Sequence, residues 1–129
     1  MQNSTPYDAI GGENALLHLV DRFYFYMDTL PESQGIRALH QNGLTSAKDK
    51  LFKFLSGWLG GPNLFIEEFG HPMLRARHLP FIIGEAERDQ WMLCMDKALA
   101  DVAMDSQLKI NIQNALQQLA THMINQLPQ

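Results

Sequence analysis

The sequence is short of cysteine and of long apolar runs. Cys94 is the single cysteine among 129 residues, so no disulfide can form within the chain, and a reducing compartment is the simplest interpretation. No stretch approaches the about 18 consecutive apolar residues of a membrane span, and the first ten residues lack the basic and apolar regions of a signal peptide. We therefore expect a cytoplasmic protein without a membrane as partner.

An excess of positive charge and the common catalytic motifs are also missing. The 10 Lys and Arg against 14 Asp and Glu give a formal net charge of −4, the wrong sign for binding nucleic acid. Glycine-rich phosphate motifs and the GxSxG motif of hydrolases are absent. Five histidines occur without CxxC, HxxxH or HExxH spacing, and on a helix His71 and His78 would lie about 10.5 Å apart, too far for one zinc ion. Nucleotide-binding, hydrolase and zinc-dependent functions therefore have little support.

Valine occurs only at positions 20 and 102, and the hydrophobic residues, 46% of the chain, recur instead at steps of three and four. This pattern predicts one all-α domain over residues 1–129. The expected elements are a short helix from Pro6 capped by Thr5, a helix from Glu13 to about Thr29, a turn near Ile36 and Leu39, a helix capped by Thr45 or Ser46 and ending at Gly60, and helices from Glu85 to about Val102 and from Ser106 to about Asn125.

Residues 62–84 form the least periodic part of the chain. They hold three of the six prolines and two of the nine glycines, which predicts a loop with a turn or two of helix around Met73 to His78. Irregular segments of this length inside a small domain are usually functional or disordered, and the apolar content here argues against disorder. A bound planar, apolar cofactor would give these side chains a partner.

The octet Leu74 to Phe81, LRARHLPF, ends a short basic turn with a histidine. Pro80 biases Leu79 away from the helical conformation, so His78 should stand at a helix end. One histidine is enough to hold a haem iron, because the porphyrin supplies four equatorial nitrogens, and Arg77 could reach a carboxylate of the same ligand. The alternative is a structural histidine stabilised by the helix dipole, and the octet alone does not exclude it.

Five stretches of this sequence resemble group II of the truncated haemoglobins, a globin family with a two-over-two helical sandwich. The resemblance runs from Tyr7 to about Asn125, and Trp91 is the residue that indicates group II. The stretches are Tyr7 to Gly12 (YDAIGG), Arg22 to Tyr24 (RFY), Trp58 to Pro62 (WLGGP), Gly70 to Phe81 (GHPMLRARHLPF) and Glu87 to Trp91 (ERDQW).

This resemblance implies a role for particular residues around haem b, iron protoporphyrin IX. His78 would be the proximal ligand of the iron, with Arg77 and Lys50 near the haem propionates. Tyr24, Trp91 and His40 would stabilise a ligand on the distal side, where Ala47 takes the place of the gate histidine of ordinary globins. The candidates to line the ring are Leu51, Phe54, Trp58, Phe81 and Met95.

Two or three hydrogen-bond donors aimed at a bound diatomic ligand predict high oxygen affinity through slow release. Storage, sensing or chemistry on the bound oxygen is then more credible than oxygen transport. The resemblance implies O2, CO and NO as ligands, and NO dioxygenation or peroxide-dependent redox activity would require an external electron donor. We expect a monomer or a weak homodimer. The alternative is an all-helical interaction module without haem, which docks a partner through the apolar 62–84 segment.

Overall fold

The computed structural model describes residues 5–126, and this part of the chain is helical without strands. The elements are α1 (Pro6–Ile10), α2 (Gly12–Thr29), the 3-10 helix η1 (Pro31–Ser33), α3 (Gln34–Ala38), α4 (Thr45–Trp58), α5 (Leu64–Phe69), α6 (Leu74–His78), α7 (Glu85–Ala100) and α8 (Ser106–His122). The expected all-α class is confirmed. None of the helices within residues 5–126 is both long and apolar enough to cross a membrane.

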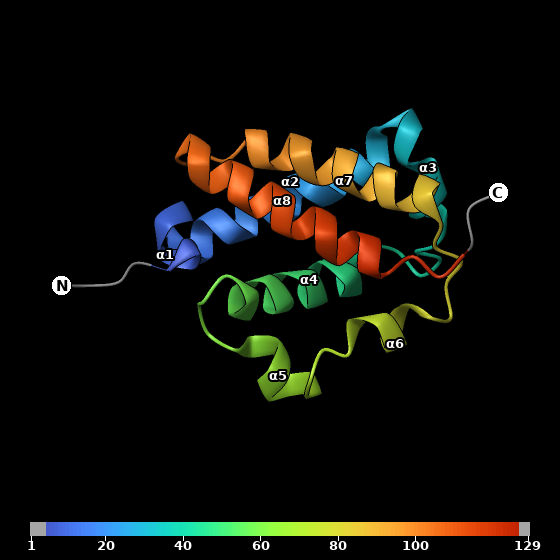
Figure 1. Cartoon of the computed structure of the whole chain (residues 1–129), viewed down its shortest axis with the longest axis horizontal. Coiled ribbons are helices and arrows are strands. Elements are labelled where there is room, and N and C mark those ends of the chain that lie inside the picture. The colour runs from blue at the N-terminus through green and yellow to red at the C-terminus, as the bar shows by residue number, and fades with distance from the viewer. Residues whose placement is uncertain (1–4, 127–129) are drawn as a thin grey trace.

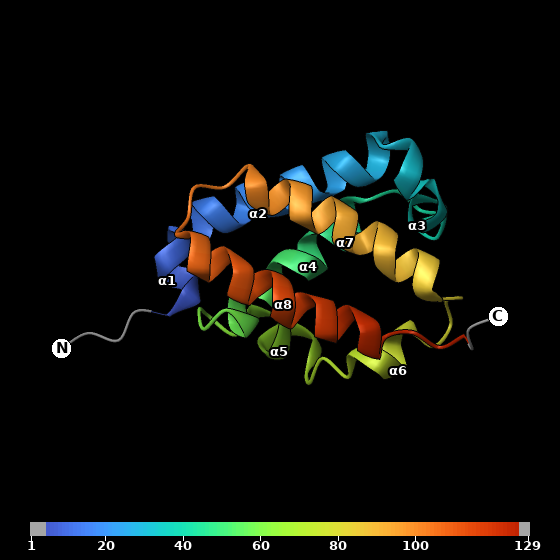
Figure 2. The ribbon, with the colours of Figure 1, turned by 45° about the horizontal axis from the view of Figure 1, so that its top comes forward.

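The four long helices form two pairs. Helix α2 packs on α4 and on α7, and α7 packs on α8. Figures 1 and 2 show α7 and α8 lying across α2 and α4, while the short helices α5 and α6 lie beyond α4. The fold is therefore a two-over-two helical sandwich, with α5 and α6 outside it.

The core lies between the two pairs and comes mainly from α2 and α7. Every apolar residue that the spacing places on the inner face of α2 is buried, and so are five residues of α7. These are Leu16, Leu19, Val20, Phe23, Tyr24 and Met27 on α2, and Met92, Cys94, Met95, Ala98 and Leu99 on α7. Burying one large apolar side chain contributes roughly 1.5–3 kcal/mol, so this shared face holds the sandwich together.

The helix starts are partly as predicted. Thr5 is the N-cap of α1, since its hydroxyl oxygen accepts the Asp8 N–H at 3.1 Å. The prediction of Thr45 or Ser46 as the cap of α4 is wrong. Helix α4 begins after Leu44, whose carbonyl accepts the Lys48 N–H at 2.8 Å, and no side chain caps it. Leu44 packs against the core, and this contact sets the entry into α4 in place of a polar cap.

The segment 62–84 has more structure than expected. Helix α6 confirms the predicted turn, but α5 lies where a loop was predicted. Phe65 of α5 is buried and packs against Phe54 of α4 and Phe69, with ring centroids 6.3 Å and 4.8 Å apart. This packing stabilises a helix that is too short to form by itself in water. The last two helices end a few residues earlier than predicted, at Ala100 and His122.

Candidate functional site

His78 is the last residue of α6 and is half-buried. Its Nδ1 lies 2.6 Å from the carbonyl oxygen of Leu74, four residues earlier. A carbonyl can only accept, so Nδ1 carries the proton and donates it to Leu74. In the neutral imidazole this tautomer leaves the lone pair of Nε2 free, which is the form that binds a metal. The backbone bond also orients the ring, as outer-shell partners do for metal-binding histidines.

Helix α6 and the residues around it have little apolar cover. None of the five residues of α6 is buried. Four large apolar side chains next to it are exposed, namely Met73, Leu79, Phe81 and Ile82. Apolar side chains that lie near one imidazole with a free ring nitrogen provide a surface suited to a flat, apolar ligand.

Helix α4 carries three of the predicted lining residues. Leu51, Phe54 and Trp58 recur at three- and four-residue steps and are half-buried. A cavity of about 190 Å³ is lined by Phe54, Trp58 and Phe65. Other residues of α4, α5 and the turns beside α5 complete its wall. His78 is not among its lining residues. The structure thus brings part of the predicted lining together, but in a cavity next to α5.

The remaining two lining candidates differ from each other. Phe81 follows α6 and is 42% exposed, so its ring is free to cover a ligand beside His78. Met95 lies on α7 and is fully buried in the core between the helix pairs. Met95 can therefore serve only as the floor of a site.

Tyr24 and His40 lie near each other, as the resemblance implies. Tyr24 is 5% exposed, and its ring meets that of His40 edge-on with centroids 6.2 Å apart. Burial raises the pKa of the Tyr24 phenol well above its ordinary value, so Tyr24 stays protonated and can donate a hydrogen bond. His40 donates from Nδ1 to the Ile36 carbonyl at 2.9 Å, which leaves its Nε2 free.

Trp91 lies on α7 and is half-buried, with its ring 5.1 Å from that of Phe23. Phe23 also packs edge-on against Tyr24 at 4.9 Å, so one phenyl ring contacts two of the three predicted distal residues. Within residues 5–126, no side-chain nitrogen or oxygen is both fully buried and without a hydrogen-bond partner. The donor groups of Tyr24 and Trp91 make no hydrogen bond to that part of the chain, so they keep some accessible surface from which to meet a ligand.

A second cavity, of about 560 Å³, lies between α2 and the start of α4. It is lined by His18, Asp21, Arg22, Tyr24, Phe25, Asp28, Leu44, Thr45 and Lys48. Tyr24 is the only predicted site residue in it, and His78 does not line it. Lys48 and Asp21 of this cavity form an ion pair at 3.2 Å that joins α2 to α4.

Arg77 and Lys50 are both exposed. Arg77 donates from Nε to the Pro72 carbonyl at 2.6 Å and from Nη2 to the carbonyls of Phe69 and His71 at 3.1 and 3.3 Å. The guanidinium thus holds the turn before α6, a role that the sequence did not indicate. Lys50 Nζ lies 5.8 Å from the Phe69 ring.

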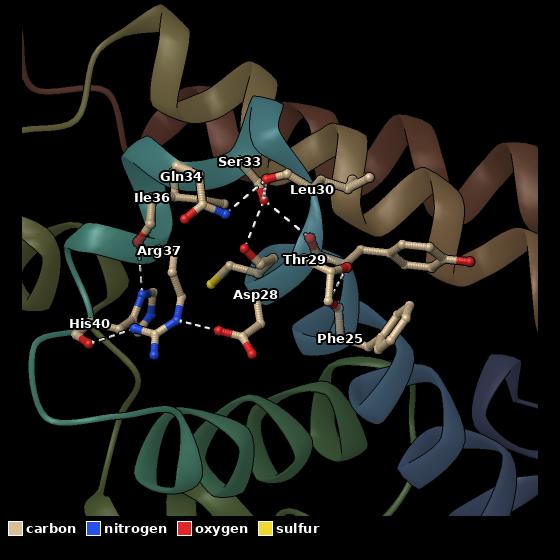
Figure 3. A network of polar contacts seen from close by, with 11 residues as sticks. Phe25, Asp28, Thr29, Leu30, Ser33, Gln34, Ile36, Arg37 and His40 are labelled. Carbon is tan, nitrogen blue, oxygen red and sulfur yellow. Dashed lines mark hydrogen bonds and ion pairs between the residues drawn. The ribbon is translucent and has the colours of Figure 1, made fainter.

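The segment that carries His40 is held by an ion pair, which the sequence did not predict. Arg37 donates from Nε to Asp28 at 2.8 Å and from Nη1 to the His40 carbonyl at 3.0 Å (Figure 3). The same view shows the Ser33 hydroxyl against the end of α2, where it is 2.8 Å from the Met27 carbonyl. These contacts anchor both ends of the turn that leads from α2 to His40.

Gln90 is a second supporting residue that sequence reasoning missed. Its side-chain oxygen accepts the Ile36 N–H at 2.9 Å, and the carbonyl of the same Ile36 accepts from His40. The approach depends on Gly35, because a Cβ there would lie 2.7 Å from Gln90 Oε1. The only signal in the sequence is the position of Gln90 directly before Trp91. Two adjacent residues of α7 therefore lie at the candidate site: Trp91 packs its ring against Phe23, and Gln90 bonds to Ile36 of α3.

Replacing Gln90 by leucine should lower the free energy of unfolding by about 1–3 kcal/mol, because the partly buried Ile36 N–H would lose its acceptor. Urea unfolding measures this change. Gln117→Leu, at an exposed position of α8, is the matched control and should change stability by less than about 0.5 kcal/mol. Equal effects of the two substitutions would contradict the assigned role of Gln90.

Known proteins similar to this chain include truncated, two-on-two hemoglobins. A family model described as bacterial-like globin matches residues 5–125. The chain is 41% identical over 123 residues to the group 2 truncated hemoglobin YjbI of Bacillus subtilis (strain 168), which covers 95% of this chain and 90% of that protein. A solved group II 2-on-2 hemoglobin from the plant pathogen Agrobacterium tumefaciens has a TM-score of 0.95 and 42% identity, with 98% of each chain covered. The truncated oxygen-avid haemoglobin from Bacillus subtilis has a TM-score of 0.84 and 41% identity, with 95% of this chain and 100% of that chain covered.

Proposed function

Because this chain belongs to the bacterial-like globin family, as a group II truncated haemoglobin, we propose that it binds haem b with His78 as the ligand of the iron. The globin family implies a haem cofactor and diatomic gases as ligands. The observation that supports His78 is the hydrogen bond from its Nδ1 to the Leu74 carbonyl, which leaves Nε2 free for a metal. When bound, the haem supplies an iron that takes O2, CO or NO.

The surroundings of His78 fit a porphyrin. The exposed side chains of Phe81 and its neighbours offer an apolar surface, and Leu51, Phe54 and Trp58 of α4 supply half-buried apolar groups. We assign Met95 to the floor of the site. Lys50 and Arg77 are the cations that would meet the haem propionates, since both are exposed and Arg77 Nη1 makes no hydrogen bond within residues 5–126.

We propose Tyr24, Trp91 and His40 as the groups that hold the bound gas. Tyr24 stays protonated and, like Trp91, keeps a donor that no residue in the described part of the chain uses. In a pocket sheltered from water each such donor contributes on the order of 1–3 kcal/mol to ligand retention. This supports high oxygen affinity through slow release. The similar truncated haemoglobin from Bacillus subtilis is oxygen-avid, which supports high oxygen affinity for this chain.

Slow release favours oxygen storage, sensing or chemistry on NO and reactive oxygen species over oxygen transport. NO dioxygenation and peroxide-dependent activity consume electrons, so we propose an external electron donor as a partner for any turnover. A cytoplasmic location is consistent with the single Cys94, which is buried in the core. We propose a monomer or weak homodimer, in which Phe25, 47% exposed on α2, is the aromatic residue available for self-association.

The visible absorption spectrum of the purified protein tests this proposal, first in the ferric state and then reduced under carbon monoxide. We expect a strong Soret band that shifts when carbon monoxide binds. A folded protein that takes up no haem, even after reconstitution with it, would overturn the proposal and favour the interaction module that docks a partner through residues 62–84.

A further inference from the structure

Asn125 connects the end of the chain's last helical region to the segment that follows His78. It lies three residues after α8 and is half-buried. Its side-chain amide donates to the carbonyls of Phe81 at 2.8 Å and His78 at 3.3 Å, while its side-chain oxygen accepts the Ile83 N–H at 3.0 Å. Its backbone N–H also donates to the Ile83 carbonyl at 2.8 Å. One residue therefore contacts both the carbonyl of His78 and the loop that leads to α7.

A second side chain, this time from α6, contacts the end of α8. Arg75 of α6 donates from Nη1 to the carbonyls of His122 and Ile124, at 2.6 and 2.9 Å, at the end of α8. Figures 1 and 2 show the segment after α8 running beside the segment that joins α6 to α7. Arg75 and Asn125 thus tie the two segments together on both sides of His78.

Helix α6 needs such support because little else holds it. It has five residues, buries none of them, and has no side-chain cap at its start. Met73, directly before it, has a φ of 44°, a left-handed conformation that costs energy for a residue other than glycine. Isolated helices of this length are unstable in water. Because α6 ends at His78, the His78 carbonyl has no α-helical partner; it accepts from the Phe81 N–H, at 3.0 Å, and from Asn125, at 3.3 Å.

From these contacts we infer that Asn125 is a positioning residue for His78: its side-chain amide, bonded to the His78 carbonyl, fixes where the imidazole stands relative to the iron. This inference rests on the proposed role of His78 as the iron ligand. Asn125 itself does not touch the haem; it acts through the backbone of the residue that does. The C-terminal segment is then part of the proximal side of the site.

The test compares Asn125→Ala and Asn125→Asp in the haem-loaded protein. Alanine removes all the side-chain bonds of Asn125. Aspartate keeps an oxygen for the Ile83 N–H but cannot donate to the carbonyls of His78 and Phe81. Two quantities are measured: the iron–histidine stretching band of the reduced, ligand-free protein by resonance Raman spectroscopy, and the rate of haem transfer to excess apomyoglobin. We expect both variants to shift or broaden the band and to lose haem about tenfold faster, the lower end of the range for outer-shell partners.

The matched control is Asn114→Ala, an exposed asparagine in the middle of α8, which should leave the band and the rate of haem loss unchanged. Circular dichroism checks that each variant is folded, and if the alanine variant does not fold, the aspartate variant decides. A wild-type band and rate in Asn125→Asp would overturn the inference while the proposed function stands. If the wild type takes up no haem, or shows no iron–histidine band, the proposed function itself fails.

Discussion

Replacing His78 by alanine should abolish tight haem binding or alter the Soret band strongly. Its Nε2 is the nitrogen that the hydrogen bond to Leu74 leaves free beside the apolar side chains around α6. An alanine there has no atom that can bind the iron. The spectrum of the variant, ferric and then reduced under carbon monoxide, measures the loss. His18→Ala and His122→Ala are the controls, since both residues are exposed on α2 and α8, and they should retain a normal Soret band.

His40 makes a further comparison necessary, because it has the same hydrogen-bond arrangement as His78. Both rings donate from Nδ1 to the carbonyl four residues earlier, and both leave Nε2 free. Residual haem in His78→Ala could therefore be held by His40 from the other side. The double variant His78→Ala, His40→Ala should lose that residual haem. Equal retention of haem in the variants at positions 18, 78 and 122 would overturn the assignment of His78.

Substituting Trp91 by phenylalanine should accelerate oxygen dissociation by at least several-fold and up to about 100-fold, because it removes one donor worth on the order of 1–3 kcal/mol in a pocket sheltered from water. The aromatic ring against Phe23 is kept, so packing changes little. Stopped-flow displacement of oxygen by carbon monoxide measures the rate. An unchanged rate would remove Trp91 from the groups that hold the gas.

Tyr24→Phe extends this prediction and supplies a matched control. Tyr24 is buried and its hydroxyl has no partner within residues 5–126, so its loss should also speed oxygen release. The hydroxyl of the neighbouring Tyr26 instead lies 2.6 Å from Asp101, and Tyr26→Phe should leave the rate unchanged. Rates in the double variant Tyr24→Phe, Trp91→Phe show whether the two donors act independently or as a unit. Equal rates in the Tyr24 and Tyr26 variants would exclude Tyr24.

Patterns within a few residues of one another were predicted correctly from the sequence. The apolar spacing of α2 placed Leu16 to Met27 in the core, and the Thr5-Pro6 pair marked the start of α1. Pro80 indicated that the helix carrying His78 ends there, and α6 does end at His78. These predictions succeed because side-chain period, capping and proline geometry act over one or two turns of chain.

Other features could not be predicted from the sequence, because the residues that cause them lie far apart along the chain. Helix α5 exists because Phe65 packs on Phe54 of α4, and α4 begins directly after Leu44 because that residue packs against the core. The supports of the two histidines are of the same kind. Gln90 reaches across 54 residues to Ile36, and Asn125 reaches across 47 residues to His78.

The sequence by itself determined that this chain is all-helical, where most helices lie, and, through its motifs, that it resembles group II truncated haemoglobins with His78 as the expected iron ligand. Only the tertiary structure decided which nitrogen of His78 is free, what Arg77 binds, and which residues hold α3 and α6 in place. The reason is physical. A helix forms from the periodicity of its own residues, whereas a hydrogen bond to a backbone carbonyl depends on where the rest of the fold brings that carbonyl.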